Sequence, residues 1–237
     1  MTATIEIASP ERETLGHLIL SLADNKAALG RRYGEWAVSA PTLESAVAAA
    51  AMAQDELGHA RATYPLLKQL GLEVREDEER LELGACVPVL ASEFPGWEWF
   101  VAANLAVDGM LTAFVRACEE SAFTGLAQRA RKILQEERSH GVHARAWARR
   151  LARDERRRDA FATALGDCWW QAARWAGPAE DAGFATLVSH GLVSDGPDAL
   201  RGSLRRTIGE VLDDTGLPRL ALPEPRDWAG WTPEERV

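Results

Sequence analysis

The chain of 237 residues has few cysteines and no long apolar run. The three cysteines, Cys86, Cys118 and Cys168, include no pair at CxxC spacing. This argues against a disulfide framework or a zinc ribbon and fits a reducing cytoplasm. We find no stretch of about 20 apolar residues, the length that a membrane span needs, and no basic-then-apolar export signal. We therefore expect a cytoplasmic protein that does not enter a membrane.

Positive charge is also in the minority. Lysine and arginine number 27 against 36 acidic residues, so the formal net charge is −9 and nucleic acid is not an expected partner. Hydrophobic residues make up 46% and charged residues 27%, the balance of a soluble globular protein. The length suits a single domain, spanning residues 1–237, with a substantial core.

Strand signals are missing as well: we find neither apolar–polar alternation nor an Asn-Gly hairpin turn. Apolar residues recur instead at helical spacing along nearly the whole chain. The expected helices cover about 11–37, 43–70, 95–121, 126–152 and 156–176, with one or two more within 180–214. Two long hairpins joined by a connection predict an all-α four-helix bundle, about 11–152, followed by C-terminal helices, about 156–214, and an irregular tail, 215–237.

Two Glu-x-x-His pairs stand on different predicted helices: Glu56 with His59, and Glu137 with His140. Residues three apart share one face of a helix, so each pair can offer a carboxylate oxygen and an imidazole nitrogen to the same metal ion. A single pair of this kind is weak evidence in an acidic helical chain. Two pairs on two long helices are more specific, because dimetal carboxylate bundles use this arrangement.

The distance of each residue from its hairpin turn strengthens this prediction. Residues equally far from the turn of an antiparallel hairpin lie at the same depth. Asp108 and Glu137 are equally far from the link expected between their helices, and the residue that matches Glu56 across Pro41 is Lys26. Both hairpins therefore bring polar residues to one depth, about 22 Å from the turns at 1.5 Å per residue.

The same reasoning excludes Glu35 as a ligand from the first helix. Glu35 is nine residues closer to the turn than Lys26, which places it about 13 Å from the level of the other ligands. Lys26 lies on the apolar stripe between Leu22 and Leu29 and should point inward. We take Lys26 as a candidate catalytic residue at the centre.

The chain resembles the ferritin-like subunits of phenylacetyl-CoA epoxidase, a multicomponent oxygenase that acts on the ring of an aryl-CoA thioester. The likeness covers roughly residues 15–225 and rests on these segments: Gly34-Glu35-Trp36, Ala40-Pro41-Thr42-Leu43, Ala53 to His59, Val107-Asp108-Gly109, Glu136 to His140 and Trp169-Trp170.

The family has a catalytic subunit with a diiron site and a silent sister subunit of the same fold. By resemblance, the metal ligands of this chain are Glu56, His59, Asp108, Glu137 and His140. The family's glutamate on the first helix corresponds to Lys26, and a lysine near the family's site corresponds to Met52. The ligand pairs, which the silent subunit has lost, are both present here.

Lys26 leaves three arrangements open. The residues favour two metal ions, with iron implied by the resemblance, provided that Lys26 loses its proton or water completes the second site. A single ion, of iron or another transition metal, is the second arrangement. In the third, the ammonium group replaces the metal and the buried acids form a salt-bridged network.

Other residues receive weaker assignments. Asp55 and Glu136 each stand four residues before a candidate histidine and could orient the imidazoles, although solvated acids are common at such positions. His143 follows His140 by one turn and is a candidate for the surroundings of the site. Tyr33 lies near the apolar stripe of the first helix but should be one to two turns away from the site, too far for us to assign it a radical role.

The resemblance implies a dioxygen-activating oxygenase in phenylacetate catabolism, with an aromatic or acyl-CoA substrate. Because we find no flavin or iron–sulfur motif in the sequence, electrons would come from a separate reductase. The chain would associate with itself or with a related ferritin-like subunit. The alternative is a silent structural subunit of such a complex, in which Lys26 takes the place of a metal.

Overall fold

A computed structural model describes residues 7–72 and 86–213, and in the tail residues 215, 217, 222, 223, 225 and 228–236. These residues form helices and irregular segments and no strand. The prediction of an all-α, ferritin-like fold is confirmed. Much of the predicted connection between the two hairpins, residues 73–85, and part of the predicted irregular tail lie outside the described residues.

The first hairpin consists of α1 (Ser9–Trp36) and α2 (Leu43–Thr63), packed along each other. The Thr42 hydroxyl caps α2 by accepting a hydrogen bond from the Ser45 amide at 3.2 Å. The single helix expected over 43–70 is interrupted after Thr63, and α3 (Pro65–Gln69) follows. Pro65 explains the break, because proline has no amide hydrogen to continue the helical ladder.

The second hairpin pairs a composite helix with α7 (Thr124–Arg153). The composite helix consists of α5 (Trp97–Ala103), a π-helical segment η2 (Asn104–Asp108) and α6 (Gly109–Ala117). The sequence predicted the helices but not the π-helical turn. Such turns often occur at functional sites, and this one ends on the candidate ligand Asp108.

The helix Trp97–Ala117 is long and apolar enough to cross a membrane by length and composition, a property that the sequence prediction missed. Most of its apolar stretch, 78%, is buried inside the protein. The buried Asp108 also lies within it. This placement is typical of the core helix of a soluble protein.

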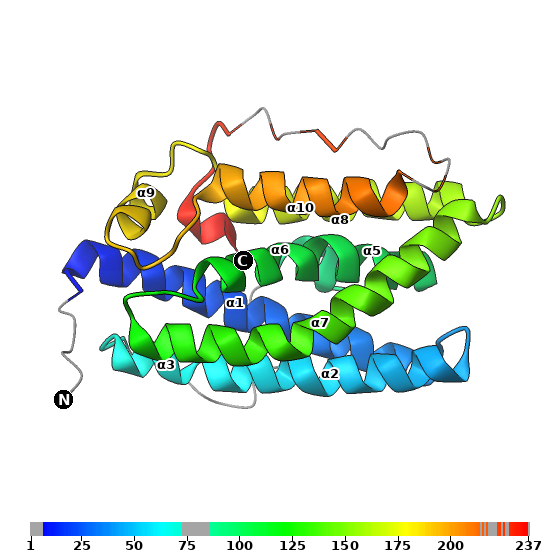
Figure 1. Ribbon diagram of the computed structural model, residues 1–237, viewed down its shortest axis with the longest axis horizontal. Helices are drawn as coiled ribbons and strands as arrows, with labels where there is room; N and C mark the ends of the chain where they lie inside the picture. The colour runs from blue at the N-terminus through cyan, green and yellow to red at the C-terminus, as the bar shows by residue number, and fades with distance from the viewer. Residues whose placement is uncertain are drawn as a thin grey trace.

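The C-terminal helices are α8 (Arg158–Ala176), α9 (Ala182–Ser189) and α10 (Pro197–Leu212). In Figure 1, α8 and α10 lie along one side of α5 and α6, α2 lies on the other side, and α7 crosses obliquely from the level of α3 to the end of α8. Two short 3-10 segments complete the described elements, η1 (Pro88–Leu90) and η3 (Pro233–Arg236). The composite helix is thus enclosed between two layers of helices.

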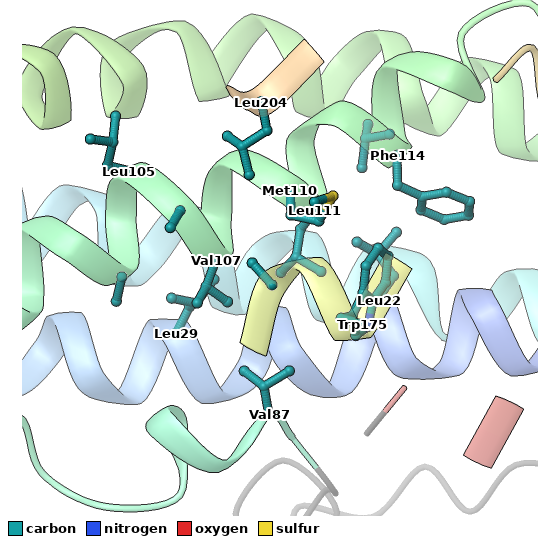
Figure 2. Packing of buried hydrophobic residues seen from close by; sticks show 14 of the residues in the cluster. Leu22, Leu29, Val87, Leu105, Val107, Met110, Leu111, Phe114, Trp175 and Leu204 are labelled. Carbon is teal, nitrogen blue, oxygen red and sulfur yellow. The ribbon is translucent and has the colours of Figure 1, made fainter. Parts of the chain in front are cut away.

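The middle of α1 is buried on all sides, since every residue from 21 to 30 is buried. Figure 2 shows Leu22 and Leu29 of α1 among core side chains that include Val107 and Met110 of the composite helix and Trp175 of α8. Because α1 is enclosed in this way, its polar residues are buried too. This is how Lys26 comes to lie inside the bundle.

A close approach of α1 and α2 depends on Gly30. A methyl group added at Gly30 would lie 2.8 Å from Leu57 Cγ and 3.1 Å from the Ala53 carbonyl oxygen. Gly34, one turn later on α1, has no atom closer than 3.9 Å to the same added group. The two helices are therefore in close contact at Gly30, one turn from Lys26.

The end of the chain is fastened to α8 and α9 through the buried Arg236. Its guanidinium forms an ion pair with Asp181 and donates to the carbonyl oxygens of Trp175 and Ala176, at 3.2 and 3.3 Å. The Arg236 carbonyl accepts a hydrogen bond from Ser21 of α1. The tail thus ties the C-terminal helices to the bundle.

Candidate metal centre

Candidate ligands from three of the four bundle helices converge at one buried point. Glu56 comes from α2, Asp108 from η2, and Glu137 and His140 from α7. One ligand atom from each of these four residues lies within 4.8 Å of the others, so the group could hold a metal ion. Each of the four is at most 5% exposed. The equal-depth expectation for these residues thus agrees with their positions in the structure.

Lys26 of α1 occupies the middle of this group. Its ammonium nitrogen donates to Glu56 Oε1 at 3.1 Å, to Asp108 Oδ1 at 2.6 Å and to Glu137. Burial by itself would lower the pKa of Lys26, but Asp108, Glu137 and Glu56 outweigh it and raise the pKa well above its usual value. Lys26 therefore carries a positive charge among the three carboxylates.

The two imidazoles present their Nδ1 atoms to the same carboxylates. His140 Nδ1 lies 3.1 Å from Glu56, 3.3 Å from Glu137 and 3.5 Å from Asp108. His59 Nδ1 lies 3.4 Å from Glu137 and 3.8 Å from Glu56. Neither nitrogen has a well-directed hydrogen bond. His140 belongs to the group that could hold an ion, whereas His59, which the sequence also proposed as a ligand, lies beside that group and outside it.

The charged side chains of the group shift the pKa values of His59, His140 and Glu137. Burial opposes protonation of His59, but the Glu137 and Glu56 carboxylates raise its pKa to about 9. The pKa of His140 is raised further, against its burial, by Asp108, Glu137 and Glu56. The pKa of Glu137 lies well below its usual value because Lys26 and the two imidazoles outweigh burial. Without a metal ion, both imidazoles carry protons at neutral pH.

The outer nitrogen of each imidazole meets a carboxylate from the opposite helix. His59 Nε2 of α2 lies 2.8 Å from Glu136 of α7, and His140 Nε2 of α7 lies 3.2 Å from Asp55 of α2. The sequence suggested Asp55 and Glu136 as partners of the imidazoles. The pairing crosses between the helices, which spacing along one helix does not reveal.

His143 lies outside this group. Its ring faces Trp97 and Phe100, with ring centroids 5.9 and 6.0 Å apart. Burial, together with the charge on His140, lowers the pKa of His143 to about 4, so its imidazole is neutral at pH 7. Glu35, which the depth argument excluded, pairs with Arg32 at 2.9 Å instead.

Tyr33 corrects a prediction, because the structure places it directly against the site. Its hydroxyl donates to Asp108 Oδ2 at 3.3 Å and accepts a hydrogen bond from Asn104 Nδ2 at 3.1 Å. Asn104 also donates to Asp108 Oδ2 at 3.0 Å. Sequence reasoning missed both residues. Tyr33 lies two turns beyond Lys26 on one face of α1, and Asn104 lies four residues before Asp108, which could have indicated them.

A cavity of about 470 Å³ reaches the centre from the side of the composite helix and α10. Asp108, Glu137 and His140 lie at its buried end. Apolar side chains such as Leu105, Leu134 and Leu204 line its walls. Its more accessible lining residues include three arginines: Arg116, Arg138 and Arg145. The cavity suits a small molecule with an apolar body and a negatively charged end.

Comparison with known proteins connects this site to a family. The sequence matches the family of phenylacetic acid catabolic proteins over residues 1–235, nearly its whole length. The chain belongs to this family. No match was found among curated proteins. The resemblance to phenylacetyl-CoA epoxidase subunits is thus confirmed at the level of the family, and phenylacetic acid catabolism is the process with which the family is associated.

The donor set of this family member fits one divalent ion better than two. The three carboxylates supply three negative charges, and the Lys26 ammonium neutralises one of them. The remaining two match either one divalent ion with neutral imidazoles or two protonated imidazoles. A second divalent ion would have to displace Lys26 from the position where it contacts all three carboxylates.

Proposed function

We propose that this chain is an iron-dependent, dioxygen-activating oxygenase component of phenylacetic acid catabolism. The observation that carries the proposal is the convergence of Glu56, Asp108, Glu137 and His140 at the end of a cavity large enough for a small substrate. Three carboxylates and imidazole suit ferrous iron, although other transition metals accept the same ligands. We infer one ion per chain, beside the Lys26 ammonium.

The chain's own residues would prepare the site for this chemistry. Glu56, Asp108, Glu137 and His140 would hold the ion, and Asp55 and Glu136 would orient the imidazoles through their outer nitrogens. The helices around the centre exclude bulk water, which protects a reactive site from side reactions. Reduced iron, when bound, supplies the electrons with which dioxygen is activated.

The substrate that we propose is an aromatic or acyl-CoA compound. Its ring would lie between the apolar walls of the cavity, next to the carboxylate–imidazole group. Its charged portion would lie near Arg116, Arg138 and Arg145. The family's association with phenylacetic acid catabolism supports an aromatic substrate, and the arginines support an anionic one.

We also propose that the protein is cytoplasmic, receives electrons from a separate reductase and binds a second subunit. Three exposed apolar residues at the α1–α2 turn support a protein partner: Val38 is 90%, Leu43 78% and Val47 63% exposed. Such a patch is unusual on a surface that faces only water. The partner would be another copy of the chain or a related ferritin-like subunit.

Anaerobic loading with ferrous iron, followed by exposure to oxygen, tests the oxygenase proposal. We expect about one tightly bound ion per chain, oxygen uptake and a change in the absorption spectrum. Glu137→Gln and His140→Phe should abolish tight binding, whereas Glu120→Gln, which changes an exposed carboxylate paired with Arg131, should bind normally. Absence of bound iron in the wild-type protein would contradict the proposal.

One observation favours a second function, that of a silent structural subunit. Lys26 already neutralises part of the carboxylate charge and bonds to all three groups. In that case the freshly purified protein contains no transition metal and gains no stability from added iron. Metal content per chain therefore separates the two functions.

A further inference from the structure

Tyr33 connects the centre to a row of aromatic rings. It is fully buried, its hydroxyl is hydrogen-bonded to Asp108, and its ring centroid lies 4.9 Å from that of Phe100. Phe100 stacks on Trp97 with centroids 4.2 Å apart and planes only 12° from parallel. Tyr33 and Trp97 are thus connected through the ring of Phe100, which contacts both.

The row continues to the edge of the protein. The Trp97 and Trp147 centroids are 5.2 Å apart, and Trp147 retains 8% exposure. The Arg150 guanidinium lies 4.6 Å above the Trp147 ring. A side branch joins Trp97 to Trp36 at 5.4 Å. Three oxidisable rings, Tyr33, Trp97 and Trp147, therefore lie along a path from Asp108 to the surface of α7, with Phe100 between the first two.

Packing alone does not explain the indole at Trp97. Its Nε1 atom is buried and has no hydrogen-bond partner among the described residues. An unsatisfied buried donor costs about 1–3 kcal/mol. Buried tryptophans normally find a partner for this group. A phenylalanine would stack on Phe100 without the cost, so the structure points to a use for the electronic properties of the indole.

We propose that Tyr33, Trp97 and Trp147 form an electron-transfer relay between the centre and the surface beside Arg150. The inference rests on the proposed function, because the dioxygen-oxidised metal centre is the oxidant. Electron transfer through protein weakens steeply with distance, so several short steps between oxidisable rings are faster than one long step. When no substrate occupies the cavity, the relay would carry electrons inward and reduce the oxidised centre.

Each passage through the relay moves one electron inward. Tyr33 gives one electron to the oxidised centre and its phenolic proton to Asp108 Oδ2. Trp97 then reduces the Tyr33 phenoxyl radical, which takes the proton back from Asp108. Trp147 reduces the Trp97 radical cation, and an external thiol reduces Trp147 and ends as half of a disulfide. Each passage consumes one thiol, whose proton passes to the solvent, and returns one electron to the oxidised centre.

The sequence provides a matched control, because it contains only two tyrosines. Tyr64 is also buried, but its hydroxyl donates to Asp24 of α1 at 2.6 Å. Tyr33→Phe removes the proposed relay tyrosine, and Tyr64→Phe leaves Tyr33 as the only tyrosine. Trp97→Phe removes the middle oxidisable ring.

The first experiment exposes the reduced, iron-loaded protein to oxygen without substrate and freezes it for electron paramagnetic resonance. We expect a tyrosyl radical in the wild type and in Tyr64→Phe, and none in Tyr33→Phe. In Trp97→Phe the radical should persist several-fold longer, and oxidised Trp147 should disappear from peptide mass spectra. A signal that survives in Tyr33→Phe, or an unchanged lifetime in Trp97→Phe, would overturn the relay.

The second experiment uses the metal-free protein, so that it does not depend on the proposed function. Flash-oxidised ruthenium tris-bipyridyl removes an electron from tryptophans near the surface, and the radical should reach Tyr33 through Trp97. We expect the tyrosyl signal to be lost in Tyr33→Phe, kept in Tyr64→Phe and delayed several-fold in Trp97→Phe. If the protein binds no iron, the proposed function fails, and this experiment still decides whether electrons pass between the surface and Tyr33 through Trp97. If iron binds and consumes oxygen but neither experiment yields a Tyr33 radical, the relay alone fails.

Discussion

Lys26 shows how one side chain determines what a buried acidic group can hold. In a bundle with four carboxylates, the charges call for two divalent ions; here an ammonium group contacts the three carboxylates that remain. A buried charge is stable only while its partners are present. The consequences of replacing Lys26 therefore depend on whether the substitute removes or reverses the charge.

Lys26→Met should destabilise the metal-free protein. It leaves Glu56, Asp108 and Glu137 buried without their ammonium partner, and breaking a buried ion pair costs about 3–5 kcal/mol. Urea unfolding followed by circular dichroism measures this loss. Lys132→Met, which makes the same change at an exposed position of α7, should alter stability by less than about 0.5 kcal/mol. Equal stabilities of the two variants would contradict the role of the Lys26 charge.

Lys26→Glu should convert the centre from one ion to two. The substitution supplies a carboxylate at the place of the ammonium group. Because it adds a negative charge, it should destabilise the metal-free protein more than Lys26→Met does. Added ferrous or zinc ions should restore stability, with about two ions per chain in mass spectrometry under native conditions. A single ion in both the wild type and Lys26→Glu would show that another residue limits the second site.

Metal binding should strengthen as the pH rises. The pKa of His59 is raised to about 9 and that of His140 is raised further, so both imidazoles are protonated at neutral pH. His140 must lose its proton to bind the ion, and the positive charge of the ion favours loss of the proton of His59 as well. Zinc affinity should therefore increase with pH, by about one decade per pH unit for each proton released, and less steeply above about pH 9, where free His59 is already neutral. Calorimetry in buffers of different ionisation enthalpy counts the protons. His143→Phe should not change the count, because His143 is already neutral at pH 7.

At the scale of elements, α1 and α2 form a hairpin whose packing depends on a small residue. Gly30→Ala should destabilise the protein by about 1–3 kcal/mol, because the added methyl group meets Leu57 and the Ala53 carbonyl. Gly34→Ala, on the same helix, should be neutral or stabilise by up to about 1 kcal/mol through helix propensity. Thermal unfolding of both variants checks the prediction, and a loss at Gly34 as large as at Gly30 would contradict it.

Helices and their relative depth could be predicted from the sequence because they depend on local patterns. Apolar spacing located α1, α7 and α8 within two residues, and equal distance from the turns placed Asp108 level with Glu137. The rotation of one helix about another is not a local property. For that reason the crossed carboxylate–imidazole pairs, the π-helical turn and the contact of Tyr33 with Asp108 emerged only from the structure.

At the scale of the whole molecule, the tail and the bundle should unfold together. Arg236→Met removes the buried ion pair with Asp181 and the hydrogen bonds to α8, and should cost about 3–5 kcal/mol. Arg206→Met, at an exposed position of α10, should have little effect. Hydrogen exchange should show lower protection in both α8 and α1 for Arg236→Met. Lower protection confined to the last residues would show that the tail is independent of the bundle.

The crossed pairs between α2 and α7 also link the interior to the outside of the protein. Each imidazole is aimed by an acid on the neighbouring helix, so sliding α2 along α7 would misdirect both nitrogens at once. The outer surface of α2 carries the exposed Leu43 and Val47. A subunit that bound to this surface and displaced α2 would change the affinity of the site for the ion. Subunit assembly and metal binding would then be coupled in this protein.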